Sequence, residues 1–347
     1  MSLPDPAPPR KLRRLGIYAP FVLVMVAAAI WSGLWVWARG QAYARMDAAV
    51  AELSRAGYQI AWQGREIGGY PFRMDVTLTD AEVREPSGWV LRAPRLEAEA
   101  YMHALGHWLI AAPAGATFVR PEAGGVAVTG KLIRASLSGF DKDPPNFDFE
   151  GVNLTFLPLP GAQPFSLSAA DRVEFHLRAG PDDQGGVFLN VQNGKAQLAG
   201  LFARIAGDKP ISIVWNSTLS KMSAFNGPNW PAAVGHWVEA GGEMTVREAG
   251  VTAGDALIGA NGGTLSVGSD GRLRGVLPVS LRQAPRALGA LGASGVLPPE
   301  TAQAAASVAE ARQGADQQAR ATLTFQAGRT TLGPVDIGPA PKVYEVH

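Results

Sequence analysis

The chain has 347 residues, with 31 Lys and Arg, 30 Asp and Glu, and no cysteine. Without cysteine it forms no disulfide and offers no thiolate metal ligand or cysteine nucleophile. Residues 1–40 contain five basic residues and one acidic residue, so the rest of the chain holds 26 basic and 29 acidic residues, a net charge of −3. This near balance argues against nucleic acid as a partner, because proteins that bind it carry a concentrated positive field.

Residues 15–38 have the length and composition of a transmembrane helix. The segment contains no charged side chain, whereas Arg39 follows it and four basic residues precede it: Arg10, Lys11, Arg13 and Arg14. A helix of roughly 20 apolar residues crosses the hydrocarbon core of a bilayer, and short basic segments stay on the cytoplasmic side. We therefore expect residues 1–14 to be cytoplasmic, residues 15–38 to cross a bacterial inner membrane once, and the C-terminal domain to be periplasmic.

A cleaved signal peptide is the alternative interpretation of this segment. The small residues at 27–29, all alanine, resemble a cleavage site. The apolar stretch nevertheless continues beyond them, and Trp31, Trp35 and Trp37 are typical of the aromatic belt at the end of a retained span. We favour an uncleaved signal-anchor, and in either case the bulk of the chain is exported.

Residues 39–57 are predicted to form a juxtamembrane helix. Tyr43, Met46, Val50 and Leu53 recur at helical spacing, and Gly57 is a natural stop. An apolar stripe on a helix usually packs within its own chain. We therefore expect this stripe to pack on the exported domain rather than to serve as a stalk or a surface for a partner.

Residues 58–335 are predicted to form a β-rich domain. Apolar and polar residues alternate with a period of two, as in half-buried antiparallel strands, in residues 72–79, 96–101, 152–156, 173–178 and 321–326. The dipeptides Asn193-Gly194 and Asp270-Gly271 each predict a hairpin turn, because both residues tolerate positive φ. Residues 336–347 form a C-terminal tail that either adds one edge strand or frays.

Three helices are expected to interrupt these strands. Asn229 is placed to cap a helix over residues 231–240, which Gly241-Gly242 would end. Residues 284–293 and 299–313 are rich in alanine, which favours short surface helices. The fold class is therefore mainly β, of the α+β type: an antiparallel sheet with a few helices on one face or end. The pattern leaves open whether the sheet closes on itself or curves into a groove.

Several short segments resemble a known bacterial family. They are Trp62-Gln63-Gly64, Gly69-Tyr70-Pro71-Phe72-Arg73, Gly242-Glu243-Met244-Thr245-Val246, Gly263-Thr264-Leu265-Ser266-Val267 and Asp270-Gly271-Arg272-Leu273-Arg274-Gly275. With the N-terminal anchor, the chain from about Gly16 to Leu332 resembles the domain-of-unknown-function family 2125. The strands around Asp270-Gly271 also look like one repeat of the AsmA-like envelope proteins, a weaker likeness that implies a membrane-anchored β-groove carrying lipid. The first family implies no activity and no site residues.

Candidate catalytic and metal-binding residues are few. His103 and His107 would share one face of a helix, but no third ligand lies near them, and even a catalytic zinc needs three. Ser294, in Gly292-Ala293-Ser294-Gly295, lacks the glycine spacing of a nucleophile elbow. We therefore assign no catalytic residue, cofactor or metal, and we leave the ligand-binding residues unassigned.

Four acidic residues remain as the basis of an enzymatic alternative. Asp141, Asp143 and Asp148 flank Pro144-Pro145, with Glu150 beyond, and paired carboxylates serve glycoside hydrolysis or hold calcium. Their spacing matches no calcium loop. A solvated turn is therefore the preferred interpretation.

The function predicted from the sequence is that of a non-enzymatic periplasmic protein. We expect it to bind an apolar or lipid-like ligand or to support assembly of the cell envelope. Six tryptophans outside the anchor would supply either a core or the lining of such a site: Trp62, Trp89, Trp108, Trp215, Trp230 and Trp237. The alternatives are a scaffold or accessory subunit for envelope protein complexes, and a hydrolase that uses acidic residues.

Overall fold

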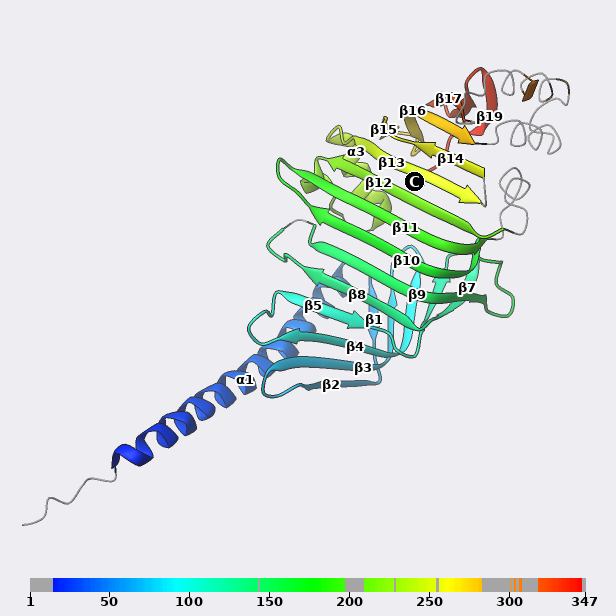
Figure 1. Ribbon diagram of the computed structural model, residues 1–347. Helices are drawn as coiled ribbons and strands as arrows, with labels where there is room; N and C mark the ends of the chain where they lie inside the picture. Colours follow the sequence, from blue (N-terminus) through cyan, green and yellow to red (C-terminus); the bar gives the residue numbers. More distant parts are fainter. Residues whose placement is uncertain are drawn as a thin grey trace, which may run out of the picture.

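The computed structural model describes residues 15–142, 144–196, 209–227, 229–253, 256–282 and 318–344, with Glu300, Gln303, Ala306 and Ser307. These residues form one long antiparallel sheet, and helix α1 (Leu15–Arg55) projects from the end that carries β2 and β3 (Figure 1). The expected cytoplasmic segment, the helix over 284–293, most of that over 299–313, and Ser294 lie outside the described residues.

The half of the sheet next to α1 consists of short strands and three long ones. They are β1 (Gln59–Ala61), β2 (Gly64–Gly68), β3 (Arg73–Arg84), β4 (Val90–Tyr101), β5 (His107–Ala111), β6 (Ala116–Arg120), β7 (Gly124–Thr129), β8 (Leu132–Ser138) and β9 (Asn146–Pro158).

The other half carries the short 3₁₀ helix η1 (Met222–Ala224) and helix α3 (Trp230–Glu239) between its strands. Its strands are β10 (Leu167–Ala179), β11 (Gln184–Ala196), β12 (Ile211–Ser220), β13 (Met244–Ala253), β14 (Ala256–Ala260), β15 (Thr264–Val267), β16 (Leu273–Arg282), β17 (Gln318–Gln326), β18 (Arg329–Leu332) and β19 (Val335–Pro339).

The order of strands follows the chain almost throughout. Strands β1 and β2 both pair with β3, and β9 through β13 pair in sequence. Between β4 and β9 the sheet divides: β5 and β8 join one half of these strands, while β6 and β7 join the other. Because all of these pairings are antiparallel, short turns suffice to connect them.

The C-terminal end of α1 closes with a glycine motif. Gly57 has a φ of +90°, its N–H donates to the carbonyl of Ser54, and the N–H of Tyr58 donates to the carbonyl of Leu53. This is the Schellman arrangement, which satisfies carbonyls that the helix end leaves unpaired. The helix therefore runs without interruption through both segments, 15–38 and 39–57, before the first strand begins.

The middle of α1 is held against the turn between β2 and β3. The indole Nε1 of Trp31 donates to the carbonyl of Pro71 at 2.7 Å, and that of Trp35 donates to the carbonyl of Arg73 at 2.9 Å. The hydroxyl groups of Ser32 and Tyr70 lie 2.8 Å apart. Further along, Tyr43 and Met46 of α1 pack on a cluster of buried residues that includes Met74 and Val76 of β3. The prediction that this stripe packs on its own domain is confirmed for these two residues.

The sequence patterns of turns and caps had mixed outcomes. Asp270-Gly271 connects β15 and β16, which pair from Val267 with Leu273, so this hairpin is confirmed. The side chain of Asn229 accepts a hydrogen bond from the N–H of Ala232 and caps α3. The hairpin predicted at Asn193-Gly194 is wrong, because both residues lie inside β11. Asn193 takes a φ of +49°, and the pairing with β12 shifts there, so the dipeptide forms a bulge.

The β2–β3 turn gives a test of how α1 is docked. Gly69 has a φ of +93°, and a Cβ at this position would lie 2.8 Å from the carbonyl oxygen of Arg73. A Cβ on the neighbouring Gly68 would meet nothing within 4 Å. We expect Gly69→Ala to lower the free energy of unfolding by at least about 1–2 kcal/mol, the cost of a left-handed conformation with a side chain, and Gly68→Ala to change it little.

Urea unfolding of the full chain in detergent, followed by tryptophan fluorescence, measures both variants. Equal losses in the two variants would contradict the tight turn described for Gly69.

Candidate functional site

One face of the sheet carries an unbroken line of apolar side chains. Residues that pair across antiparallel strands share a face, so the strand register traces this line from β3 to β17. Its twelve members, here called the apolar row, are Val76, Ala98, Ile110, Ala135, Phe149, Phe175, Leu189, Trp215, Ala249, Ala260, Val279 and Ala321. At about 4.8 Å between neighbouring strands, the row is about 50 Å long.

Two flanking lines widen the apolar row in the middle of the sheet. One consists of Ile133, Gly151, Val173, Val191, Ile213 and Val251, and the other of Leu137, Phe147, Leu177, Val187, Ser217 and Val246. Ser217 is the one polar side chain in the two lines. It is fully buried and accepts a hydrogen bond from the Nε1 of Trp215 at 3.0 Å, which satisfies its hydroxyl. Together the three lines form a continuous apolar face.

Helices cover this apolar face at two places and leave cavities against it. Between α1 and strands β3, β4, β5 and β8 lies a cavity of 670 Å³, here called the helix cavity. Val234 and Trp237 of α3 line a second one, of 250 Å³, together with Phe175 and Leu177 of β10. Both helices therefore lie on the same face as the apolar row.

A third cavity lies between these two, where the sheet itself bends. This central cavity has a volume of 640 Å³ and is lined by strands from β4 through β10, including Phe118, Val126, Phe149 and Phe156. Its lining is apolar except at Arg134, whose guanidinium is bonded to Glu150. The volume falls within the range of small-molecule sites, but such sites usually place several polar groups to orient a ligand. The lining of the central cavity thus presents almost only apolar contacts.

The central and helix cavities meet. Leu96 of β4 and Ile110 of β5 line both of them. The next large members of the apolar row are only half-buried, namely Phe149, Phe175, Leu189 and Trp215. A sheet face of this size that remains partly open in a single chain marks a binding surface more often than a packing defect.

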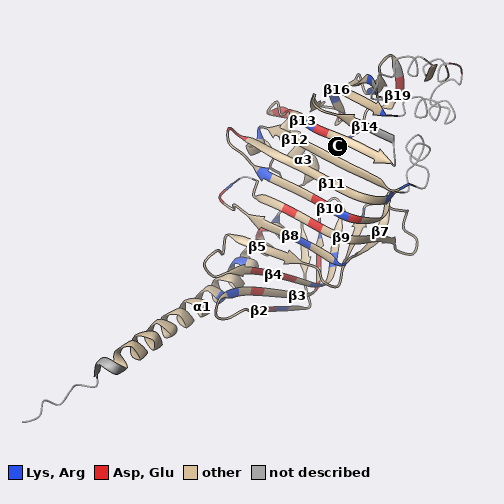
Figure 2. Ribbon diagram, viewed as in Figure 1, with Lys and Arg blue, Asp and Glu red and all other residues tan. Residues whose placement is uncertain are grey.

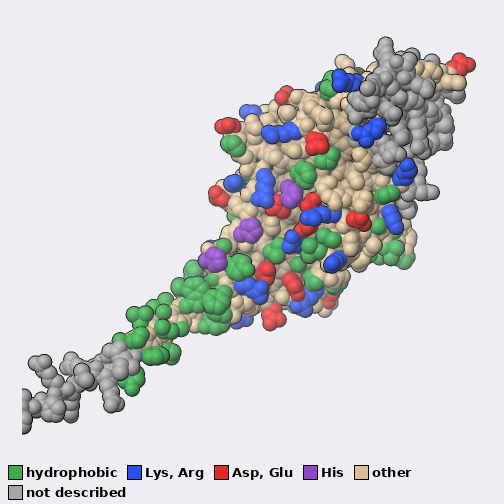
Figure 3. All heavy atoms as spheres, viewed as in Figure 1, with side chains coloured by type: hydrophobic (Ala, Val, Ile, Leu, Met, Phe, Trp, Pro, Cys, Tyr) green, Lys and Arg blue, Asp and Glu red, His purple; other side chains and the backbone are tan. Residues whose placement is uncertain are grey.

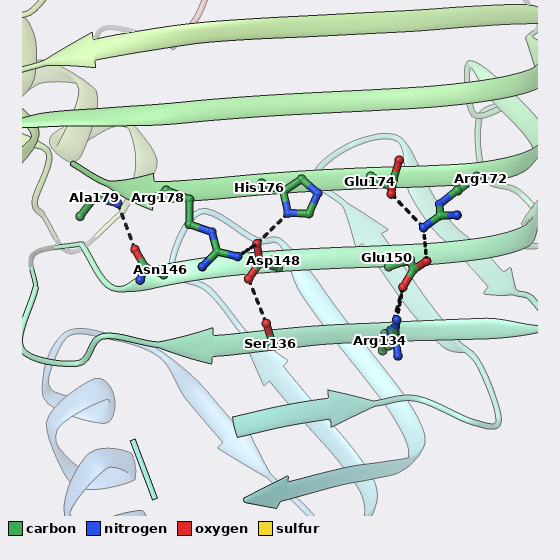
Figure 4. Close-up of polar contacts among 10 residues, drawn as sticks. All are labelled: Arg134, Ser136, Asn146, Asp148, Glu150, Arg172, Glu174, His176, Arg178 and Ala179. Carbon is green, nitrogen blue, oxygen red and sulfur yellow. Dashed lines mark hydrogen bonds and ion pairs between the residues drawn. The ribbon is translucent and has the colours of Figure 1, made fainter. Parts of the chain in front are cut away.

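The opposite face of the sheet is polar. Figure 3 shows basic, acidic and histidine side chains spread across it, and Figure 2 shows charged positions on β3, β4 and β8–β11. In the middle, Glu150 accepts from the Nε of Arg134 at 2.8 Å and from Arg172 at 2.6 Å (Figure 4). Nearer α1, Arg73 pairs with Asp75 and Glu99, as an ion-paired strand residue. These cross-strand pairs suit a solvated face.

Asp148 is the hub of a second polar group on this face. It accepts from the Oγ of Ser136 at 3.0 Å and from Arg178 at 2.8 Å, and the Nδ1 of His176 lies 2.6 Å from its Oδ1 (Figure 4). Burial alone would raise the pKa of Asp148, but the hydrogen bonds from His176 and Ser136 and the charge of Arg178 outweigh it, so the pKa lies below its usual value. The carboxyl group is therefore kept ionised.

This group does not have the geometry of a hydrolytic triad. In a triad the serine hydroxyl bonds to the histidine that activates it. Here Ser136 and His176 both bond to Asp148, from opposite sides of strand β9, and Figure 4 shows no contact between them. The arrangement orders three strands and leaves Ser136 without a base.

The residues that the sequence offered as metal or acid sites are not brought together. His103 lies in the turn after β4, where it stacks on Tyr101, and His107 begins β5, so the helical spacing expected for them is wrong. Asp141 is an exposed turn residue, whereas Asp148 lies within β9. Asp143 falls outside the described residues. Within the described part of the chain, no group of three His, Asp or Glu is placed to hold a metal ion.

The comparisons with known proteins place the chain in a family. A family model described as an uncharacterized protein conserved in bacteria, DUF2125, matches residues 35–341. The chain belongs to this family. No curated protein and no solved structure gives a match, so the weaker likeness to AsmA-like proteins is not shown. The DUF2125 match begins inside α1 and covers the whole apolar row, which makes this face part of the family domain.

The contacts of Asp148 in this DUF2125 chain predict how its stability falls in acid. Because the folded-state pKa of Asp148 is depressed, its contribution to stability is present above the ordinary aspartate pKa of 3.8 and is lost as the pH falls through the folded-state value. We expect Asp148→Asn to lower the unfolding temperature at neutral pH and to flatten its fall in acid. Asp141→Asn, in the exposed turn, should do neither.

Thermal unfolding of the full chain, recorded by circular dichroism between neutral pH and pH 3, checks this. An unchanged acid profile in Asp148→Asn would contradict the hub.

Proposed function

We propose that the chain is a membrane-anchored periplasmic protein that binds the hydrocarbon chains of lipid along its apolar face, without catalysing a reaction. The observation that carries this proposal is the apolar row. It continues across twelve paired strands. Its member Ile110 lines the helix cavity and its member Phe149 lines the central cavity, so the row links the two. Its length of about 50 Å exceeds the hydrocarbon thickness of a whole bilayer, about 30 Å.

The chemistry of the central cavity favours lipid over a polar metabolite. A polar ligand loses its hydration in an apolar site and needs hydrogen-bonding groups in return. In the described lining, the side chain of Arg134 is the only polar one, and Glu150 already engages it. A hydrocarbon chain needs no such partner and gains free energy in proportion to the apolar surface that it covers.

The anchor supports the same proposal. Among the described residues, α1 is the one helix long and apolar enough to cross a membrane. It projects from one end of the sheet (Figure 1). With the basic segment before it on the cytoplasmic side, the domain would stand in the periplasm with its apolar face next to a source of lipid. The scaffold and hydrolase alternatives have no comparable feature in their favour.

Two adjacent residues of β11 provide a matched test of lipid binding. Leu189 belongs to the apolar row, and Phe188 lies on the opposite, polar face beside His176. A photoreactive benzoylphenylalanine at either position reacts with C–H bonds that touch it. We expect irradiation of cells to give a phospholipid adduct at position 189, detected by mass spectrometry of the purified chain, and none at position 188.

Adducts of equal yield at both positions would indicate only detergent or membrane contact. Their absence at position 189 in a folded, membrane-bound chain would contradict the proposal.

The orientation in the membrane gives a separate prediction. A reporter enzyme that is active only outside the cytoplasm, fused after His347, should be active in whole cells, whereas the same reporter fused before Met1 should not. The reason is that the basic residues before Leu15 hold the N-terminus inside. If only the N-terminal fusion were active, the orientation would be the opposite of the one proposed.

A further inference from the structure

We infer that the space between α1 and the sheet is the portal through which a phospholipid leaves the membrane, with Arg45 receiving its phosphate. This inference rests on the proposed function and adds the point of entry and the group recognised. It begins from where the domain meets the bilayer. A span of roughly 20 residues from Leu15 ends near Leu34, and the hydrogen bonds of Trp31 and Trp35 fix the β2–β3 turn at this level of the helix.

The rim of the sheet at this level is apolar and exposed. Tyr70 and Phe72, in the β2–β3 turn, are 56% and 69% exposed. The strand register places Tyr101 opposite Arg73, and the turns that follow β4 and β8 lie at the same edge. Aromatic side chains at the boundary between water and hydrocarbon are typical of interfacial anchoring. The rim is therefore in contact with the lipid headgroups.

The helix cavity opens at this rim. Leu105, from the turn after β4, and Phe140, from the turn after β8, line the cavity and are 39% and 53% exposed. On the helix side its lining begins at Trp37 and ends at Ala49, a rise of about 18 Å. A lipid tail can therefore pass from the bilayer into the helix cavity along apolar side chains, and on through Leu96 and Ile110 into the central cavity.

Arg45 is the charged side chain of this passage. The lining of the helix cavity contains two polar side chains with no aromatic ring, Gln41 and Arg45. Arg65 is paired with Asp47, but the exposed side chain of Arg45 forms no hydrogen bond or ion pair with another described residue. It lies about 12 Å beyond Trp37 along the helix. A phospholipid that leaves the bilayer headgroup first would bring its phosphate to Arg45 while its tails still occupy the opening of the helix cavity at the rim. A guanidinium group binds phosphate through paired hydrogen bonds.

The test uses the full chain, with benzoylphenylalanine at position 189, stripped of lipid and reconstituted into vesicles of phosphatidylethanolamine and phosphatidylglycerol. Ala42 lines the helix cavity, whereas Ala44 is exposed on another side of α1. We expect Ala42→Trp to reduce the early yield of lipid adduct to that of an unirradiated sample, and Ala44→Trp to leave it unchanged. Equal unfolding temperatures of these two variants serve as the control for folding.

Arg45→Glu tests the headgroup contact, with Arg55→Glu, near the same helix end but outside the cavity lining, as its match. Reversing the charge at position 45 should lower the early adduct yield about tenfold, and reversing it at position 55 should have little effect. Competition by excess inorganic phosphate would instead assign Arg45 to free phosphate and overturn the headgroup assignment.

The outcomes separate this inference from the proposed function. Adduct that forms at position 189 regardless of Ala42→Trp and Arg45→Glu overturns the portal while the lipid-binding face stands. Absence of adduct in the parent chain overturns the proposed function itself.

Discussion

The register of the sheet is the constraint on which the rest of this structure depends. In a strand, a slip of one residue exchanges its two faces, so an apolar line across twelve strands requires every pairing from β3 to β17 to be in phase. A sheet with one apolar face normally buries it against a second layer. Here α1 supplies such a layer at one end and α3 supplies one over β10 and β12. The central cavity lies between them, where the sheet bends and its own strands line the space.

The polar face contributes to the same register. Glu150 bridges Arg134 of β8 and Arg172 of β10, and Asp148 bridges Ser136 and His176 of the same two strands. Each bridge holds β9 in phase with both neighbours, because a slip of one residue would place these carboxylates against apolar side chains of β8 and β10, such as Leu137 and Phe175. Surface ion pairs contribute little to stability individually. Their value here lies in specifying which residues of β9 face the apolar side, namely Phe147 and Phe149.

The split between β4 and β9 explains where the cavities form. Strands β5 and β6 pair with successive parts of β4, and β7 and β8 pair with successive parts of β9, each pair with a break between them. Beyond the break β5 pairs with β8 and β6 pairs with β7, and residues of all four strands line the central cavity. A cavity lined this way needs no second sheet. It also opens toward α1, through Leu96 and Ile110.

Local sequence patterns predicted local structure well. The alternation in residues 72–79 became β3, Asp270-Gly271 became a hairpin, and Asn229 capped α3. Asn193-Gly194 failed because its strand continues on both sides, and positive φ serves a bulge as readily as a turn. His103 and His107 failed because a spacing of four has meaning only on a helix.

The candidate site was the part that the sequence did not reveal. Its members come from strands far apart in the chain, and each line across the sheet depends on pairings that no local pattern encodes. One signal was nevertheless present. Residues 146–150 alternate polar, Phe, Asp, Phe and Glu, which is a strand with an aromatic face. The same stretch also belongs to an acidic cluster, and the pattern of that cluster gives no indication that Phe147 and Phe149 share an apolar face. Of the six tryptophans outside the anchor, Trp108 lines the helix cavity, Trp230 and Trp237 line the cavity beneath α3, and Trp215 belongs to the apolar row.

The polarity around the apolar row shows whether lipid covers this face. Because the chain has no cysteine, a single cysteine carrying a nitroxide label can be placed at Phe149, Phe175 or Leu189, and at Asn190 on the polar face for comparison. In membranes, we expect labels in the row to report an apolar environment that excludes water and becomes wetter when lipid is removed, whereas the label at position 190 should stay wet throughout. Equal exposure to water at all four positions in native membranes would contradict it.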